Sequence, residues 1–341
     1  MAERQGSGLS RRGLLGSVAA VAAGSPLVAA AAATQPETTD TAHRILGLFA
    51  RLPGTVSLKI VAPPAGGKRG MRVVLSPSQR LFVGSAIKTF VLAECLRQAD
   101  GPGVVQTLRD RQLDLDERVW SADSATFNPP HLKGVVSERT TLEAMIMHSD
   151  NTGTDMSLKL AGPDKVRAFI AAAGLGSTQI PDSTRSFFGY LLGARDYKNF
   201  TWAQLVAAAD DPIVNPPLND TETLASSADD LVSYYSRALQ GAFFRHQETL
   251  AEFRRILSLG DAIWLVPLPI GGSAFVKGGS IDVPGFHALC VPGGMLFGDR
   301  WVYFAFILNW RASATTDPKT VADFTRAVSR AMEIVKERLS L

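Results

Sequence analysis

Apolar residues change their spacing twice along this chain, and the order of these changes limits the folds that it can adopt. Two strand-like stretches, residues 55–62 and 71–75, are joined by a Pro- and Gly-rich segment and predict a β-hairpin. Helical spacing then dominates from about residue 85 to about residue 259. The clearest helical segments of this block are residues 89–96, 142–147, 165–173 and 228–239.

Strand character returns after the helical block. Breaks at Pro292-Gly293-Gly294 and Gly298-Asp299 divide this region into a predicted meander. Its three strands are residues 273–276, 286–291 and 301–308. A short helix is expected before the first strand, at residues 40–51, and an amphipathic helix capped by Asp317 after the last one.

This order of elements predicts an α/β protein of the α+β kind. The outer parts would form one antiparallel five-stranded sheet flanked by the terminal helices. The block from about residue 85 to 259 would be an inserted all-helical lobe. A ligand is expected to bind in a cleft between the lobe and the sheet.

Residues 1–33 are typical of an export signal. Arg11 and Arg12 stand before an apolar stretch rich in Ala and Val, and the pair of arginines favours the twin-arginine route. Gly24-Ser25-Pro26 interrupts this stretch well short of the roughly 20 residues that cross a bilayer. We therefore expect cleavage, no stable membrane insertion afterwards, and a periplasmic or secreted domain of residues 34–341.

Composition narrows the range of partners. Basic and acidic residues are nearly balanced, at 35 and 32, and no basic face with interleaved aromatic residues predicts binding to nucleic acid. The five histidines show no metal-ligand spacing, so neither a metal nor another cofactor is implied. Cys95 and Cys290 lie in apolar surroundings and are expected to be buried thiols, although a disulfide between them stays open.

A Ser-x-x-Lys motif opens the helical block. Ser85 and Lys88 are three residues apart at the start of a helical run and would share one face. A lysine whose pKa is lowered by burial or nearby positive charge can take the proton of a serine hydroxyl. Such a match also arises by chance, and for the motif taken alone a helix cap followed by a surface lysine is the better explanation.

Two further motifs follow in order. Ser149-Asp150-Asn151 comes after an apolar helical run, where a helix C-cap is the alternative explanation. Lys277-Gly278-Gly279-Ser280 ends a predicted strand, where a bulge or turn is the alternative. The first lies in the helical block with Ser85, and the second lies on a late strand.

In this order and setting the three motifs resemble the SxxK, SDN and KTG set of class A β-lactamases and the related penicillin-binding proteins. The resemblance extends to residues 81–94 and 141–158 and implies the β-lactamase/transpeptidase-like fold. It further implies a serine acyl hydrolase that forms a covalent acyl-enzyme and most naturally hydrolyses small-molecule amides or lactams, with antibiotic resistance as an associated property. A D,D-peptidase or esterase on the same scaffold and a non-catalytic ligand-binding descendant stay open. A monomer is expected.

Carried over residue by residue, the resemblance makes Ser85 the acylated nucleophile, Lys88 a general base and Ser149 a proton shuttle. The backbone N–H groups of Ser85 and Ser280 would form the oxyanion hole. The implied substrate-binding residues are Asn151, Lys277, Gly279 and Ser280.

Two departures from the family pattern stand out. Gly278 occupies the place of a Thr or Ser whose hydroxyl would bind a substrate carboxylate, although the Ser280 hydroxyl could partly replace it. The ExxLN stretch that supplies the deacylating glutamate is absent from the matching residues 180–188, where Asp182 is the nearest acid. Phe187, Phe188 and Tyr190 in this region are expected either to line an acyl pocket or to pack in the core.

Overall fold

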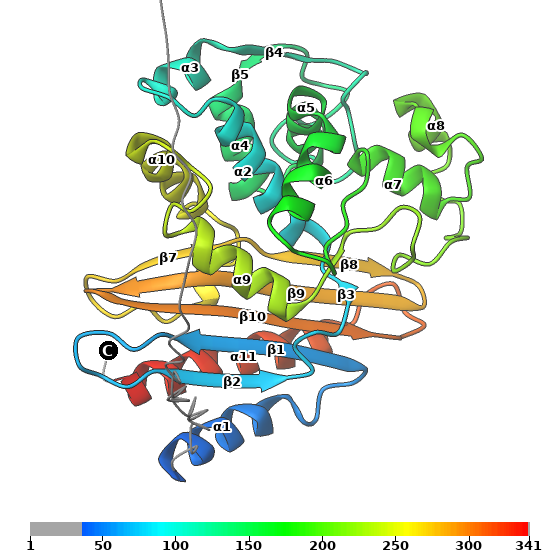
Figure 1. Ribbon diagram of the computed structural model, residues 1–341. Coiled ribbons are helices and arrows are strands. Elements are labelled where there is room, and N and C mark those ends of the chain that lie inside the picture. Colours follow the sequence, from blue (N-terminus) through cyan, green and yellow to red (C-terminus); the bar gives the residue numbers. More distant parts are fainter. Residues whose placement is uncertain (1–35, 340–341) are drawn as a thin grey trace, which may run out of the picture. The chain divides into compact units, whose positions relative to one another are not determined.

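One antiparallel sheet runs through the middle of the fold (Figure 1). The structure, a computed structural model, describes residues 36–339, so the predicted export signal lies outside the described residues. In the described part, no helix has the length and apolar character needed to cross a membrane. The sheet order is β2 (Met71–Leu75), β1 (Thr55–Ala62), β10 (Arg300–Trp310), β9 (Phe286–Phe297) and an edge made of β7 (Ser273–Val276) and β8 (Gly279–Val283).

The sheet has the five positions that the sequence predicts, but its last position holds two short strands. Both β7 and β8 pair with β9, and Lys277 and Gly278 lie at the break between them. The predicted break at residues 292–294 is wrong, because β9 continues through it in register with β10. A Cβ atom on Gly293 would lie 2.6 Å from the carbonyl oxygen of Phe275, so glycine there permits close strand pairing.

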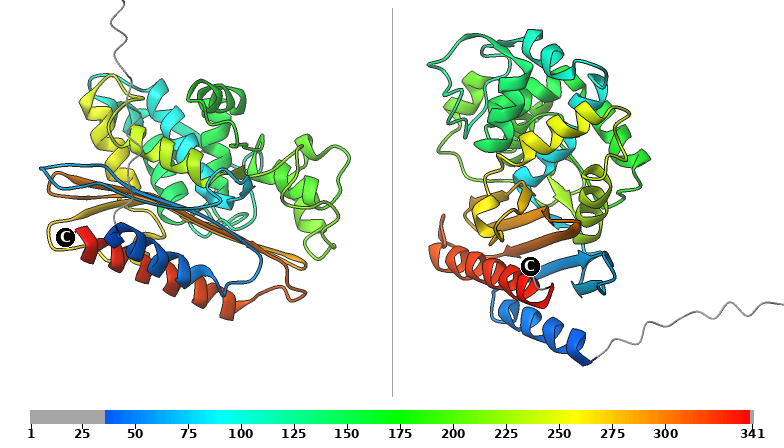
Figure 2. Two further views of the ribbon diagram at one scale, coloured as in Figure 1. Left: turned by 60° about the horizontal axis from the view of Figure 1, so that its bottom comes forward. Right: turned by 90° about the vertical axis from the view of Figure 1, so that its left-hand side faces the viewer.

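The terminal helices α1 (Pro36–Phe49) and α11 (Pro318–Leu339) cover one face of the sheet, as the two views in Figure 2 show. The Asp317 carboxylate accepts a hydrogen bond from the backbone N–H of Thr320 at 3.1 Å, which confirms the predicted cap. Between helices and sheet, the Phe49 ring stacks on Phe306 at 5.5 Å and meets Phe324 edge-on at 6.4 Å. Both helices therefore bury apolar side chains against the sheet.

The lobe covers the opposite face of the sheet (Figures 1 and 2). Its central helix, α2, is buried almost all round, and α9 lies against β9 and β10. The helices of the lobe are α2 (Lys88–Gln98), α3 (Val104–Asp110), α4 (Glu138–Met147), α5 (Asn151–Ala161), α6 (Pro163–Ala172), α7 (Thr184–Leu191), α8 (Trp202–Ala207), α9 (Ala228–Ala238) and α10 (Gln247–Leu257). Three 3₁₀ turns are η1 (Gly84–Ile87), η2 (Tyr197–Asn199) and η3 (Ile263–Leu265).

The lobe is not purely helical. It contains a small antiparallel pair, β4 (Gln112–Leu115) with β5 (Gly134–Ser137), and a second pair, β3 (Leu81–Phe82) with β6 (Ala225–Ser226), lies at its base. Strands of two to four residues are too short to leave a clear alternation in the sequence. Cys95 and Cys290 are both buried free thiols.

The segment that leads to Ser85 is fixed to the central sheet. The backbone N–H of Phe82 donates to Asn309 Oδ1 at 2.9 Å, and Asn309 Nδ2 donates back to the Phe82 carbonyl oxygen at 2.9 Å. Because Asn309 lies in β10, this reciprocal pair of hydrogen bonds fixes the position of the segment between β3 and α2 relative to the sheet.

Candidate active site

Ser85 lies in the 3₁₀ turn η1, directly before the buried helix α2. Gly84 has a φ of +53°, and a Cβ atom there would lie 2.7 Å from the carbonyl oxygen of Ser280. A Cβ atom on Gly279 would lie 2.0 Å from the carbonyl oxygen of Val83 and 2.9 Å from the nitrogen of Ser85. The start of β8 therefore contacts the turn of Ser85 backbone to backbone, which brings the N–H groups of Ser85 and Ser280 onto adjoining segments.

The Lys88 side chain is fully buried behind this turn. Its Nζ donates to Asn151 Oδ1 at 2.7 Å and to the Ser149 carbonyl oxygen at 2.5 Å, and lies 3.2 Å from Ser149 Oγ. Burial, followed by the positive charge of Lys277, lowers the pKa of Lys88 to about 7. A large fraction of Lys88 is therefore uncharged near neutral pH, as a general base requires.

Ser149 stands between two buried lysines. Its backbone has a φ of +56°, a region that side chains other than glycine rarely adopt. In this conformation its Oγ lies 3.2 Å from Lys88 Nζ and 3.1 Å from Lys277 Nζ. A hydroxyl with an amine on either side can pass a proton between them, which is the chemistry expected of a proton shuttle.

Lys277 is paired with Asp261, which belongs to none of the three motifs. Its buried Nζ donates to the Asp261 carboxylate and to the Gly278 carbonyl oxygen at 2.8 Å. Asp261 Oδ1 also accepts the backbone N–H of Gly278 at 2.7 Å. Burial lowers the pKa of Lys277, while Asp261 opposes this change. Sequence reasoning missed Asp261 because it lies alone in the connection after α10, 16 residues before Lys277.

The middle residue of the second motif has a structural role. Buried Asp150 caps α5 by accepting the Gly153 N–H at 2.8 Å, and it accepts the N–H groups of Thr126 and Phe127 at 2.9 and 3.0 Å. Asn151 Nδ2 donates to the Ala122 carbonyl oxygen at 2.9 Å. Asp150 thus holds the loop on which Asn151 also depends.

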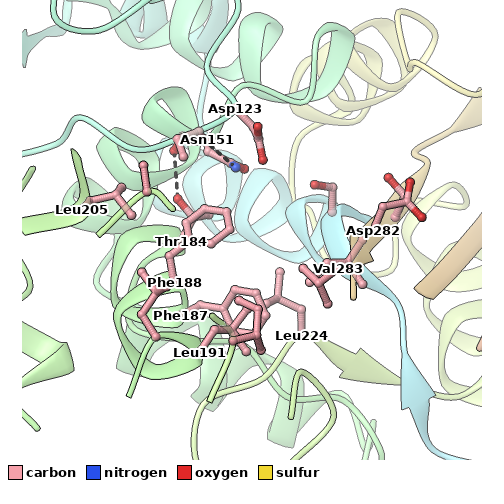
Figure 3. Close-up of a pocket in the computed structure, with 18 of the residues that line it drawn as sticks. Asp123, Asn151, Thr184, Phe187, Phe188, Leu191, Leu205, Leu224, Asp282 and Val283 are labelled. Atoms are coloured by element: carbon pink, nitrogen blue, oxygen red, sulfur yellow. Dashed lines mark hydrogen bonds between the residues drawn. The ribbon is translucent and has the colours of Figure 1, made fainter. Parts of the chain in front are cut away.

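A cavity of about 740 Å³ opens beside these residues. Ser85, Ser149, Asn151 and Ser280 line it. Behind this wall, Lys88 bonds to Ser149 and Asn151, and Lys277 bonds to Ser149. Figure 3 shows apolar side chains gathered on one side, away from Asp123 and Asp282. The apolar lining residues include Phe82, Phe187, Phe188, Leu191, Leu205, Leu224 and Val283.

The three aromatic residues singled out in the sequence lie on α7 and differ in their surroundings. Phe187 and Phe188 line the cavity, and Phe187 also stacks on Phe82 at 5.7 Å. Tyr190 instead packs edge-on against Tyr197 at 5.4 Å. The exposed His148 also lies on the cavity wall.

Asp182 is not placed to replace the missing glutamate. It lines a separate cavity and forms ion pairs with Arg167 at 2.6 Å and Lys198 at 3.1 Å. Burial opposes its ionisation, but the hydrogen bonds from Arg167 and Lys198 outweigh burial and lower the pKa of Asp182. Its location in another cavity and its two ion pairs contradict a role as the base that activates water.

Thr184 is the residue of this loop that lies on the cavity wall next to Asn151. Its hydroxyl and its backbone N–H both donate to Asp155 Oδ1, at 2.8 and 2.6 Å. Burial raises the pKa of Asp155 to about 6, against the hydrogen bonds from Thr184. The cavity wall therefore presents a hydroxyl beside Asn151, and the Asp155 carboxylate that accepts it is buried.

Comparisons with known proteins agree with this geometry. The model of the Beta-lactamase enzyme family matches residues 40–258. No curated protein sequence matches the chain significantly. Among solved structures, TLA-3 extended-spectrum β-lactamase has 13% identity and a TM-score of 0.66, covering 87% of this chain and 99% of its own.

Two other solved structures are similar to the same extent. A class A β-lactamase from Mycobacterium abscessus has 16% identity and a TM-score of 0.64, covering 88% of this chain and 100% of its own. The structure of PBP-A has 16% identity and a TM-score of 0.61, covering 88% and 97%. At such identities these structures establish the fold, while the family model covers well over half of the chain. The protein is thus a member of the β-lactamase enzyme family, a serine hydrolase with an antiparallel sheet and a helix-rich lobe.

Proposed function

We propose that the protein hydrolyses amides, lactams or esters through a covalent acyl-enzyme at Ser85, with β-lactam-type amides as the leading substrate class. The observation that carries this proposal is the buried Lys88 amine, one helical turn from Ser85 and bonded to both Ser149 and Asn151. Uncharged Lys88 takes the proton of the Ser85 hydroxyl as its oxygen attacks the substrate carbonyl carbon. The backbone N–H groups of Ser85 and Ser280 stabilise the resulting oxyanion.

The leaving group departs with a proton. When the carbon–nitrogen or carbon–oxygen bond breaks, Ser149 donates its hydroxyl proton to the leaving atom and regains one from protonated Lys88. Its contacts of 3.2 and 3.1 Å with the two lysines support this path. Water then attacks the acyl group on Ser85, which releases the acid product and restores the serine. Lys88 is the base available for this second step.

Slow deacylation of bulky adducts follows from that single base. We expect a chromogenic cephalosporin to give a burst of about one product molecule per enzyme, followed by a low steady rate. A small p-nitrophenyl ester should turn over with a smaller burst, because its acyl group leaves room for water near Lys88. Stopped-flow absorbance traces with the two substrates make the comparison.

The matched control for this experiment is Asp182→Asn. Because Asp182 lines a different cavity, its substitution should leave the steady rate of cephalosporin turnover unchanged. Fast, burst-free cephalosporin turnover that Asp182→Asn abolishes is the result that contradicts this account.

An esterase is the second candidate function. The observation that favours it is the cavity itself, whose apolar wall includes Phe187, Phe188 and Leu224 and whose loop presents Thr184 rather than a carboxylate. Such a wall suits an ester with an apolar acyl group that needs little assistance in deacylation. Higher kcat/KM for p-nitrophenyl esters than for any penicillin, cephalosporin or D-Ala-D-Ala peptide would favour the esterase over the lactamase.

We also propose that residues 1–33 direct twin-arginine export and that the protein acts as a monomer in the periplasm or outside the cell. Fusing residues 1–33 to a folded reporter should carry the reporter across the cytoplasmic membrane. Arg11→Lys combined with Arg12→Lys should block this transfer. Cell fractionation measures the outcome, and continued export of the doubly substituted fusion would point to the general secretory route. Size-exclusion chromatography of the mature protein tests the monomer.

A further inference from the structure

The charges that line the cavity are nearly all negative. Asp123 and Asp282 lie on its wall, as Figure 3 shows, and Asp211 lies at another point of the lining. In the part of the chain that the structure describes, no lysine or arginine lines this cavity. The one basic side chain on the wall is the exposed His148. Asp282 Oδ1 lies 2.8 Å from His287 Nδ1, whereas the exposed Asp123 forms no ion pair within residues 36–339.

The Lys277 ammonium, which lies behind the wall, is already paired with a carboxylate. The Lys277 ammonium donates to Asp261, and Ser149 Oγ lies 3.1 Å from the same Nζ atom. Asp261 is therefore two hydrogen bonds from a residue on the cavity wall. About 29% of its side chain is exposed, so its carboxylate is not sealed inside the protein. An anion placed near Ser149 would be attracted by Lys277 and repelled by Asp261, so Asp261 weakens the attraction.

Gly278 removes a second means of holding an anion. It has no hydroxyl, and its backbone N–H is taken by Asp261 Oδ1 at 2.7 Å. A Cβ atom on Gly278 would lie 3.0 Å from Asp261 Oδ1 and 3.1 Å from the Ala262 Cβ. Asp261 thus occupies the space into which a side chain at position 278 would begin to extend. The absence of a side chain at Gly278 and the position of Asp261 are therefore structurally coupled.

From these contacts we infer that the cavity selects acyl donors without an anionic group beside the scissile bond, and that Asp261 is a specificity-determining residue for this choice. The substrate class is a neutral or cationic ester, lactam or amide with an apolar acyl group, which the wall formed by Phe187, Phe188 and Leu224 accommodates. This inference rests on the proposed acyl-transfer function at Ser85. It also disfavours peptides that present a free terminal carboxylate at this position.

The test uses one β-lactam in two forms, as the free carboxylate and as its methyl ester. Second-order rate constants for acylation are measured above pH 8, where Lys88 is uncharged, by intact-protein mass spectrometry after rapid quenching. Wild type should acylate about tenfold or more faster with the ester than with the free acid. Asp261→Asn keeps an oxygen that can accept the Gly278 N–H but removes the charge, so it should raise the ratio of the free-acid rate constant to the ester rate constant about tenfold.

Three controls separate charge from structure. Asp261→Glu keeps the charge and should keep the wild-type preference. Asp123→Asn removes a wall carboxylate without touching Lys277, suits the left-handed backbone at φ +55°, and should raise the rate constant of the free acid severalfold. Asp164→Asn, at a surface ion pair with Arg167, should change neither rate constant.

The outcomes distinguish failure of this inference from failure of the proposed function. If neither form acylates wild type, and neutral p-nitrophenyl esters also fail, the acyl-transfer function is wrong. If acylation occurs at Ser85 but wild type prefers the free acid, the inference is wrong and the function stands. The inference also fails if Asp261→Asn folds and leaves the ratio of the two rate constants at the wild-type value. If Asp261→Asn does not fold, Asp261→Ser, which also removes the charge, takes its place in this test.

Discussion

Ser85→Ala is expected to lower kcat/KM by at least about three orders of magnitude for every substrate that wild type hydrolyses. The substitution removes the only hydroxyl that η1 presents to the cavity beside Lys88 and the start of β8. The fold should be unaffected, because the Ser85 side chain does not cap η1 or α2. Steady-state rates with a p-nitrophenyl ester and a β-lactam measure the loss.

A matched serine controls for general effects of the substitution. Ser258 lies after α10, and its hydroxyl donates to the Arg255 carbonyl oxygen at 2.7 Å, away from the cavity lining. Ser258→Ala should keep wild-type rates and a wild-type melting temperature. A Ser85→Ala variant that melts normally and retains a tenth or more of the wild-type rate would remove Ser85 from the mechanism.

Removal of the Lys88 amine should slow acylation by roughly two to four orders of magnitude. Lys88→Met is the sharper variant, since methionine fills much of the same buried volume without an amine. Lys88→Arg keeps a permanent positive charge and should be equally slow at every pH. Acylation is followed by release of p-nitrophenolate in single-turnover experiments, which separates it from the later hydrolysis.

The rate constant for acylation of the wild-type protein should increase with pH. A base must be unprotonated, and burial together with Lys277 lowers the pKa of Lys88 to about 7. The rate constant for acylation should therefore rise with pH through about 7 and level off above it, whereas an unperturbed lysine would place this rise near pH 10.4. A flat profile between pH 5 and 9 in wild type, or an acid limb that persists in Lys88→Met, would contradict the assignment of Lys88.

The sequence predicts the site best where a motif lies on one element. Ser85 and Lys88 fall on one continuous turn and helix, so their relation follows from helical spacing alone. The approach of Ser149 to Lys277 spans 128 residues and could be expected only from the family resemblance. Most of the sheet was also predictable from local patterns, because most of its strands are long enough to stand out in the sequence.

The residues that sequence reasoning missed act through tertiary contacts. Asp261 carries no motif, and its importance follows from the two bonds it makes to Lys277 and Gly278. Asp182 was the nearest acid in the sequence, yet the fold turns it toward Arg167. Gly293 was read as a strand break, although it permits close pairing with the segment of Phe275. In each case the partner lies far enough along the chain that no local pattern reports it.

The central claim, a covalent acyl-transfer site at Ser85, is tested most directly by mapping an adduct. An alkyl p-nitrophenyl phosphonate that is neutral overall should release p-nitrophenolate and leave its phosphonyl group on the serine oxygen. Trypsin cleaves after Arg80 and Lys88, and the resulting peptide Leu81–Lys88 contains a single hydroxyl, that of Ser85. We predict one phosphonyl group per protein, located at Ser85 in this peptide by tandem mass spectrometry and missing in Ser85→Ala. Labelling of another peptide, or undiminished labelling of Ser85→Ala, would contradict the account.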